Sequence, residues 1–365
     1  MPPCIVIVRV MSSSLKLRTL RHQQELSEEL KAARLPTRPE AWLLTFTTLW
    51  FTAGLFTDGW AHNHIPELET FFTPWHAVFY SGYFATALAL AGIVWRNAKR
   101  LGVRFRSAAP IGYEYALFGA SLFIFGGIGD LLWHEIFGIE ADIEALLSPT
   151  HLVLAVAMFL MVSANLRAWF KATPPLGKPK FADQLPMILS VAMSVALLWF
   201  MLQFSHFITV RAGIVPDGAD SAESLQNIAI TGYLLHVVIL LAFLFLLLRR
   251  GRIAGGAITI ISGLSMTAMG AMRDGLFLLP AVLVTGVIAD ILAARLHPLE
   301  QHRREFRAFA FAVPAIFFTA YFLTVHVQTG IAWSVHLWTG SIVMTGLAGL
   351  LLSFLVLPPS ENAVL

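Results

Sequence analysis

The chain has 365 residues, of which 57% are hydrophobic and only 13% are charged. A soluble domain carries about 25% charged residues, so this composition excludes a soluble globule and is typical of a polytopic membrane protein. The net charge is only +3, and the single cysteine, Cys4, excludes an internal disulfide framework, zinc ribbons and paired redox cysteines. Histidine is frequent instead, with 12 residues.

Residues 1–40 are predicted to form a cytoplasmic basic tail. They hold seven basic and four acidic residues, and Gln23–Arg34 is predicted as a short charged helix that ends before Pro36. The apolar stretch Cys4–Val10 is too short for a secretory signal.

From Ala41 onward, long apolar stretches alternate with short polar breaks. Most stretches reach the roughly 20 residues that a helix needs to cross a hydrocarbon core, and lipid requires every backbone polar group to be paired within the segment. The fold class is therefore predicted as an all-α transmembrane bundle built from helical hairpins. We expect ten spans, at about 41–60, 74–96, 111–137, 149–170, 185–208, 226–248, 254–272, 275–293, 308–326 and 335–357.

Lysine and arginine give the orientation. Of the 25 basic residues, 23 lie in the first tail or in the even-numbered breaks, and only Arg211 and Arg273 lie on the other side. The positive-inside rule then predicts cytoplasmic termini in a bacterial or archaeal inner membrane. Anionic lipid accounts for the basic face without nucleic acid. Nine of the 12 histidines fall on the outer side.

The first outer hairpin carries an acid–histidine pattern. Asp58 and His62 are four residues apart near the end of one span, and Pro74 precedes His76 by two residues at the start of the next. Residues at i and i+4 share one helix face, and proline is favoured in a first helical turn. A tight hairpin would therefore bring His76 opposite Asp58 and His62.

The second outer hairpin repeats the pattern with Asp130, His134, Pro149 and His151. A charged carboxylate within a span costs about 2.5–3.5 kcal/mol, which a bound cation would compensate. One carboxylate and two imidazoles suit copper, iron or zinc, and three protein ligands leave a coordination position open. The sequence thus predicts one or two metal sites in a four-helix unit, residues 41–170, followed by six further helices in 171–365.

Other polar residues near the outer tips are weaker candidates. His64 is either a fourth ligand or a loop imidazole, and outer acids are either orienting groups for ligand histidines or solvated loop residues. These acids are Glu69, Glu140 and Glu144. The remaining outer histidines are low-ranking ligand candidates: His206, His236, His326 and His336.

The first hairpin resembles the metal-binding stretch of the third subunit of the copper membrane monooxygenases, the family of particulate methane and ammonia monooxygenases. The resemblance covers about residues 55–155. The matching residues are Asp58, His62, Glu69-Thr70, Phe72-Thr73-Pro74, His76 and Phe79-Tyr80. The second hairpin is similar to the family's neighbouring metal site, with Asp130 at a position that is asparagine in the family.

The resemblance implies that the first triad binds copper within the membrane. It also implies partner subunits and oxidation by dioxygen of a small apolar substrate, such as a hydrocarbon or ammonia; a homo-oligomer is the other assembly considered. A membrane metal transporter or metal-handling protein is an alternative, although the middles of the spans are nearly free of ionisable groups. An intramembrane zinc hydrolase, with Glu135 or Glu144 as general base, is a second alternative.

Overall fold

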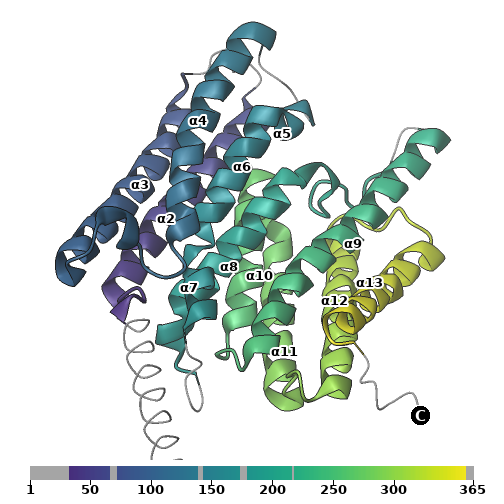
Figure 1. Cartoon of the computed structure of the whole chain (residues 1–365). Helices are drawn as coiled ribbons and strands as arrows, with labels where there is room; N and C mark the ends of the chain where they lie inside the picture. The colour runs from purple at the N-terminus through teal and green to yellow at the C-terminus, as the bar shows by residue number, and fades with distance from the viewer. Residues whose placement is uncertain (1–32, 66–71, 139–142, 173–178, 216–217, 359–365) are drawn as a thin grey trace, which may run out of the picture.

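A computed structural model describes residues 33–65, 72–138, 143–172, 179–215 and 218–358 of the chain. Every regular element in these ranges is a helix, which confirms the all-α prediction (Figure 1). The α-helices are α2 (Arg38–His64), α3 (Pro74–Leu101), α4 (Glu114–Phe137), α5 (Glu144–Leu147), α6 (Pro149–Val162), α7 (Ala164–Lys171), α8 (Phe181–Met201), α9 (Ala219–Arg250), α10 (Ala257–Met272), α11 (Leu279–Leu296), α12 (Arg303–Gln328) and α13 (Val335–Val356). Short 3-10 helices lie at η1 (Phe105–Ser107), η2 (Gln203–Ser205) and η3 (Leu276–Leu278). The helix predicted at Gln23–Arg34 lies almost wholly outside the described residues.

Seven of these helices are long and apolar enough to cross a membrane: α3, α4, α8, α9, α11 (with η3), α12 and α13. Helices α6 and α7 together form an eighth such segment, bent by 45° at Ser163. The two other predicted spans are not among the helices that are long and apolar enough. They correspond to α10, which has only 16 residues, and to α2. Helix α2 contains five threonines, and each hydroxyl donates to a carbonyl of the preceding turn, which satisfies it within the helix.

The buried apolar side chains of the described residues gather in two large clusters. One is formed mainly by α2, α3, α4, α6 and α7, and the other by α8 to α13. Figure 1 shows the first group on the left and the second on the right, joined where α8 and α10 contact α2.

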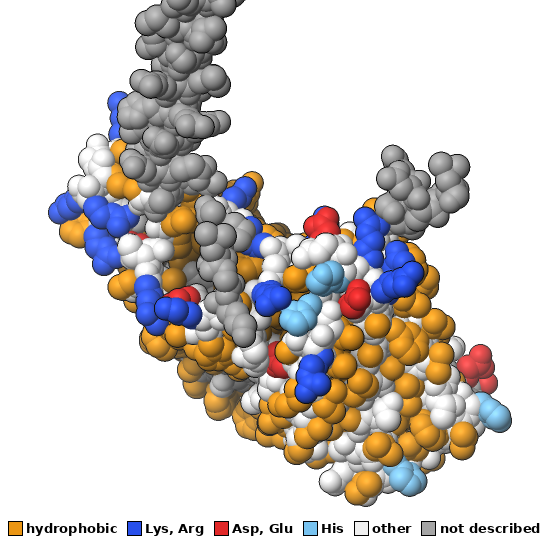
Figure 2. Space-filling model, turned by 90° about the horizontal axis from the view of Figure 1, so that it is seen from below, with side chains coloured by type: hydrophobic (Ala, Val, Ile, Leu, Met, Phe, Trp, Pro, Cys, Tyr) orange, Lys and Arg blue, Asp and Glu red, His pale blue; other side chains and the backbone are white. Residues whose placement is uncertain are grey.

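The helix ends that carry basic residues lie at one end of the bundle. Arg96 pairs with Glu40 at 2.9 Å, Arg38 approaches Asp183 at 3.9 Å, and Arg250 donates to the Phe170 carbonyl at 2.6 Å. Figure 2, seen from below, shows lysine and arginine side chains gathered on this face. The end of α2, the start of α3 and the end of α4 lie at the opposite end of the bundle (Figure 1).

Helices α2 and α3 approach each other closely through two glycines. A Cβ added at Gly54 would lie 2.6 Å from the Cα of Phe79, and one added at Gly82 would lie 2.6 Å from the Cα of Phe51. Small residues permit such approach between membrane helices. The contact brings the C-terminal end of α2 against the first turn of α3.

This packing gives a direct test with a control on the same helix. Gly82→Ala should lower the free energy of unfolding by about 1–3 kcal/mol, because the added methyl meets the α2 backbone. No described atom lies within 4 Å of the corresponding position at Gly92. There, Gly92→Ala should stabilise α3 by up to about 1 kcal/mol. Equal thermal unfolding midpoints for the two variants in detergent would contradict the close packing.

Candidate metal centres

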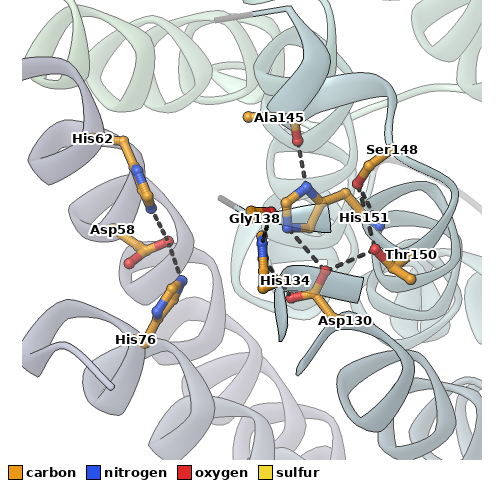
Figure 3. A network of polar contacts seen from close by, with 10 residues as sticks. All are labelled: Asp58, His62, His76, Asp130, His134, Gly138, Ala145, Ser148, Thr150 and His151. Carbon is orange, nitrogen blue, oxygen red and sulfur yellow. Dashed lines mark hydrogen bonds and ion pairs between the residues drawn. The ribbon is translucent and has the colours of Figure 1, made fainter. Parts of the chain in front are cut away.

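The first cluster joins the end of α2 to the start of α3. The Asp58 Oδ2 atom lies 3.4 Å from His76 Nε2 and 3.8 Å from His62 Nε2 (Figure 3). One ligand atom from each of the three residues lies within 4.8 Å of the others. The predicted triad is therefore brought together, at a spacing that a metal ion could bridge.

The carboxylate of this cluster is largely withdrawn from solvent. Only 13% of the Asp58 side chain is exposed, whereas His62 is 40% exposed and gives the cluster an open side. Asp58 Oδ1 is buried and accepts no hydrogen bond from any residue that the structure describes. A buried carboxylate oxygen without a donor is unfavourable, so this arrangement fits a site for a cation.

The second cluster joins α4 to the start of α6. Asp130 Oδ1 lies 3.1 Å from His151 Nε2, and Asp130 Oδ2 lies 3.6 Å from His134 Nε2. These three residues also offer ligand atoms within 4.8 Å of one another. Asp130 is buried more deeply than Asp58, with 4% of its side chain exposed. The second predicted triad is thus assembled as well.

The same local device positions the last histidine of each triad. The Thr73 hydroxyl accepts the backbone N–H of His76 at 3.1 Å, and the Ser148 hydroxyl accepts that of His151 at 3.4 Å. Each hydroxyl residue is the N-cap of its helix, with proline directly after it. The histidine therefore occupies the third helical position in both helices, where its ring faces the aspartate of the cluster.

Backbone carbonyls orient the two imidazoles of the second cluster. His151 Nδ1 lies 2.5 Å from the Ala145 carbonyl oxygen, and His134 Nδ1 lies 3.4 Å from that of Gly138. A carbonyl can only accept, so Nδ1 carries the proton and Nε2 is directed at Asp130. A nitrogen lone pair facing a carboxylate oxygen at 3.1 Å is repulsive unless a proton or a metal ion lies between them. This hydrogen-bond pattern is typical of metal-ligating histidines.

Sequence reasoning missed Thr150, whose hydroxyl donates to Asp130 Oδ1 at 2.8 Å. Its position between Pro149 and His151 was the available signal, because a polar side chain there faces the same carboxylate. The contacts of the Ala145 and Gly138 carbonyls could not be predicted, because every residue has a backbone carbonyl and its side chain does not reveal the contact. Thr150 and His151 both contact Oδ1 of Asp130, and Oδ2 is directed at His134.

The two clusters lie side by side at the same end of the bundle (Figure 3). They are close enough for Asp58 to interact electrostatically with both Asp130 and His151. Tyr80 of α3 packs against His76 on one side and against Phe123 of α4 on the other, with ring centroids 6.3 and 5.9 Å apart. Two carboxylates and four imidazoles thus converge within one region.

His64 is placed outside the first triad. Its Nδ1 lies 2.8 Å from the Trp60 carbonyl oxygen, and its Nε2 lies 3.0 Å from the Asp274 carboxylate. The hydrogen bond to Asp274 raises the pKa of His64 above its ordinary value. Both ring nitrogens are therefore engaged outside the triad, and His64 is the last residue of α2, not part of a loop.

The other described candidates do not join the triads. Glu69 and Glu140 lie outside the described residues, and Glu144 is exposed at the first position of α5. His326 and His336 are exposed near the facing ends of α12 and α13. His206 and His236 are buried against each other among the C-terminal helices, with ring centroids 4.5 Å apart.

Comparison with known proteins adds no relative. No protein-family model, no curated protein and no solved structure matches the chain.

The threonine contact yields a prediction for the second cluster. The background variant Asp58→Ala, His76→Ala removes two residues of the first cluster, so that binding at the second cluster is measured alone. In this background, Thr150→Val should weaken metal binding about 10–100-fold, because the hydroxyl that orients Asp130 is lost. Isothermal titration of the purified protein measures this affinity. Thr57→Val is the matched control, since its hydroxyl contacts the Ala53 carbonyl in α2. Equal affinities for the two variants would show that Thr150 does not support a metal ligand.

Proposed function

We propose that the chain is an integral membrane metalloprotein with two metal centres, each holding copper, that takes part in the oxidation of a small apolar substrate by dioxygen. The ligands of the first centre are Asp58, His62 and His76. The ligands of the second centre are Asp130, His134 and His151.

The repeated cluster is the observation that carries this proposal. Two hairpins of the same chain each place one shielded carboxylate against two imidazole nitrogens, with the same spacing of carboxylate to histidine and the same capped proline turn. Ordinary interface histidines would not require the same assembly twice. A divalent cation would compensate each buried carboxylate and replace the proton needed between nitrogen and oxygen.

The chain's own residues would bind each metal ion and orient its ligands. Each aspartate supplies the negative charge, and the histidines supply nitrogen ligands that are typical of copper, iron and zinc sites. In the second centre, carbonyls and Thr150 hold those ligands in position. Three protein ligands leave room for exchange with small molecules, and the 40% exposure of His62 provides an approach to the first centre.

Copper and an oxidative role follow from the resemblance to the third subunit of the membrane monooxygenases. Bound copper would supply one-electron redox chemistry with dioxygen. The apolar helices around the clusters suit a substrate that partitions into lipid, and the resemblance favours assembly with further subunits. Zinc alone in both centres would instead favour the intramembrane hydrolase.

We further propose ten spans with both termini in the cytoplasm, which adds α2 and α10 to the eight segments of sufficient length and apolarity. Helix α2 has 27 residues and a length of about 40 Å, enough to cross a bilayer. The gathering of basic side chains at one end of the bundle supports this orientation. Reaction of Cys4 with a membrane-impermeant thiol reagent in intact cells would contradict it.

Metal counting tests the centres. The full chain, purified from membranes, should contain two metal equivalents by mass spectrometry. Asp58→Ala with His76→Ala should remove one, and Asp130→Ala with His151→Ala should remove the other, because each pair loses two of three ligands. If the metal is copper, electron paramagnetic resonance should show coupling to ligand nitrogens.

Asp274→Ala with His64→Ala is the matched control, since it removes an aspartate–histidine pair from the same face but from neither cluster. It should retain both equivalents. A wild-type chain without stoichiometric metal, or cluster variants that retain it, would contradict the proposal.

A further inference from the structure

A pocket of about 220 Å³ lies in the C-terminal half, and none of its lining residues belongs to either metal cluster. Its walls come from three segments that are distant in the sequence: the α8–α9 connection, the start of α9 and the α12–α13 connection. A hydrogen bond of 2.8 Å from the Ala332 N–H to the Ala212 carbonyl joins the two connections. The pocket is therefore held by the tertiary structure and does not depend on one loop alone.

Most of the pocket wall is apolar. Val210 and Ile214 of the α8–α9 connection, Leu225 of α9 and Trp333 of the α12–α13 connection all line it. Trp333 is only 8% exposed, and its ring packs against that of Tyr233 with centroids 5.8 Å apart. This wall can enclose the carbon part of a small molecule.

Two polar side chains, Arg211 and Gln226, line the same pocket. Neither makes a hydrogen bond or an ion pair with any residue that the structure describes. Arg211 Nε is buried, whereas the two terminal nitrogens of this half-buried residue remain accessible. The guanidinium carbon lies 5.4 Å from the ring centroid of Phe277. A guanidinium offers five N–H donors, and donors without acceptors beside an apolar wall are unfavourable. The pocket thus has a cationic end that lacks an acceptor.

No described neighbour neutralises this cation. Arg273 is the other basic residue predicted on the outer side, and it donates to the Gln203 side chain at 3.0 Å. Asp220 and Glu223, at the start of α9, are exposed, and neither forms an ion pair with Arg211. Within the described part of the chain, the guanidinium is therefore available to an external anion.

We propose that this pocket binds a small organic carboxylate, with its oxygens on the terminal nitrogens of Arg211 and its carbon atoms against the apolar wall. Two parallel N–H donors of a guanidinium match the two oxygens of a carboxylate. The amide of Gln226 supplies a further donor. One negative charge balances one positive charge, and the apolar wall favours a hydrocarbon body.

The volume sets the size of the ligand. A cavity of about 150 Å³ takes benzene, so the pocket suits about nine non-hydrogen atoms, which is the size of benzoate. For a ligand of this size the dissociation constant should be about 1 mM. The phosphate of a membrane lipid carries the same single charge, but polar groups flank it on both sides and would meet the apolar wall.

Benzoate and benzamide make a matched pair of probes, because they have the same ring and size and only benzoate is charged. Saturation-transfer NMR on the full chain in detergent at pH 7 should show saturable benzoate binding, with benzamide at least about tenfold weaker. Arg211→Gln should weaken benzoate binding about tenfold or more and leave benzamide unchanged, which would show that the pocket is intact. Ala222→Phe, which fills the pocket without removing the cation, should weaken both.

Arg106→Gln is the control, since this exposed arginine lies in η1 and not in the pocket, and it should bind benzoate as wild type does. Equal binding of benzoate and benzamide, or benzoate binding that survives Arg211→Gln, would overturn the proposal. Dimethyl phosphate represents a lipid phosphodiester, and binding as tight as that of benzoate would assign the pocket to lipid instead. Benzoate binding that appears only in Asp217→Asn would assign the guanidinium to that carboxylate and would also overturn the proposal.

Discussion

The contact between a buried aspartate and two imidazole nitrogens determines the organisation of the end of the bundle at which both clusters lie. A carboxylate within an apolar bundle is unfavourable unless positive charge or hydrogen-bond donors compensate it. At Asp58 one oxygen faces both histidines, and the other has no donor among the described residues. The helices that carry these residues must therefore keep the histidines close to the carboxylate, which constrains the hairpin, its turn and its packing.

Two structural devices meet that constraint. The close approach at Gly54 and Gly82 brings α2 against α3, and a capped proline turn directs the last histidine of each cluster toward the helix that carries the aspartate. The second hairpin uses the same turn but adds Thr150, so Asp130 is better supported than Asp58. The two clusters thus share the same turn and differ in exposure: the first is open at His62, and the second is more enclosed. If both clusters bind metal as proposed, the first would exchange ligands more readily than the second.

The sequence predicts the helices and both triads because their signals are local. Apolar length marks the spans, i and i+4 spacing marks the shared face of Asp58 and His62, and a proline two residues before His76 marks the helix start. Contacts between distant segments left no such signal. His64 and Asp274 are 210 residues apart, and the pairing of His206 with His236 depends on how α9 packs beside the end of α8. The bend at Ser163 and the carbonyl of Ala145 were also hidden, since backbone geometry is set by tertiary packing.

We propose above that each triad holds a metal ion between its carboxylate and its imidazoles. Crystals of the full chain, grown without added metal, can be measured above and below the copper absorption edge. The account predicts two anomalous difference peaks, one among Asp58, His62 and His76 and one among Asp130, His134 and His151, which disappear below the edge. Peaks at other metal edges in the same positions would retain the centres and change the metal. Maps without a peak at either triad at any transition-metal edge would contradict the account.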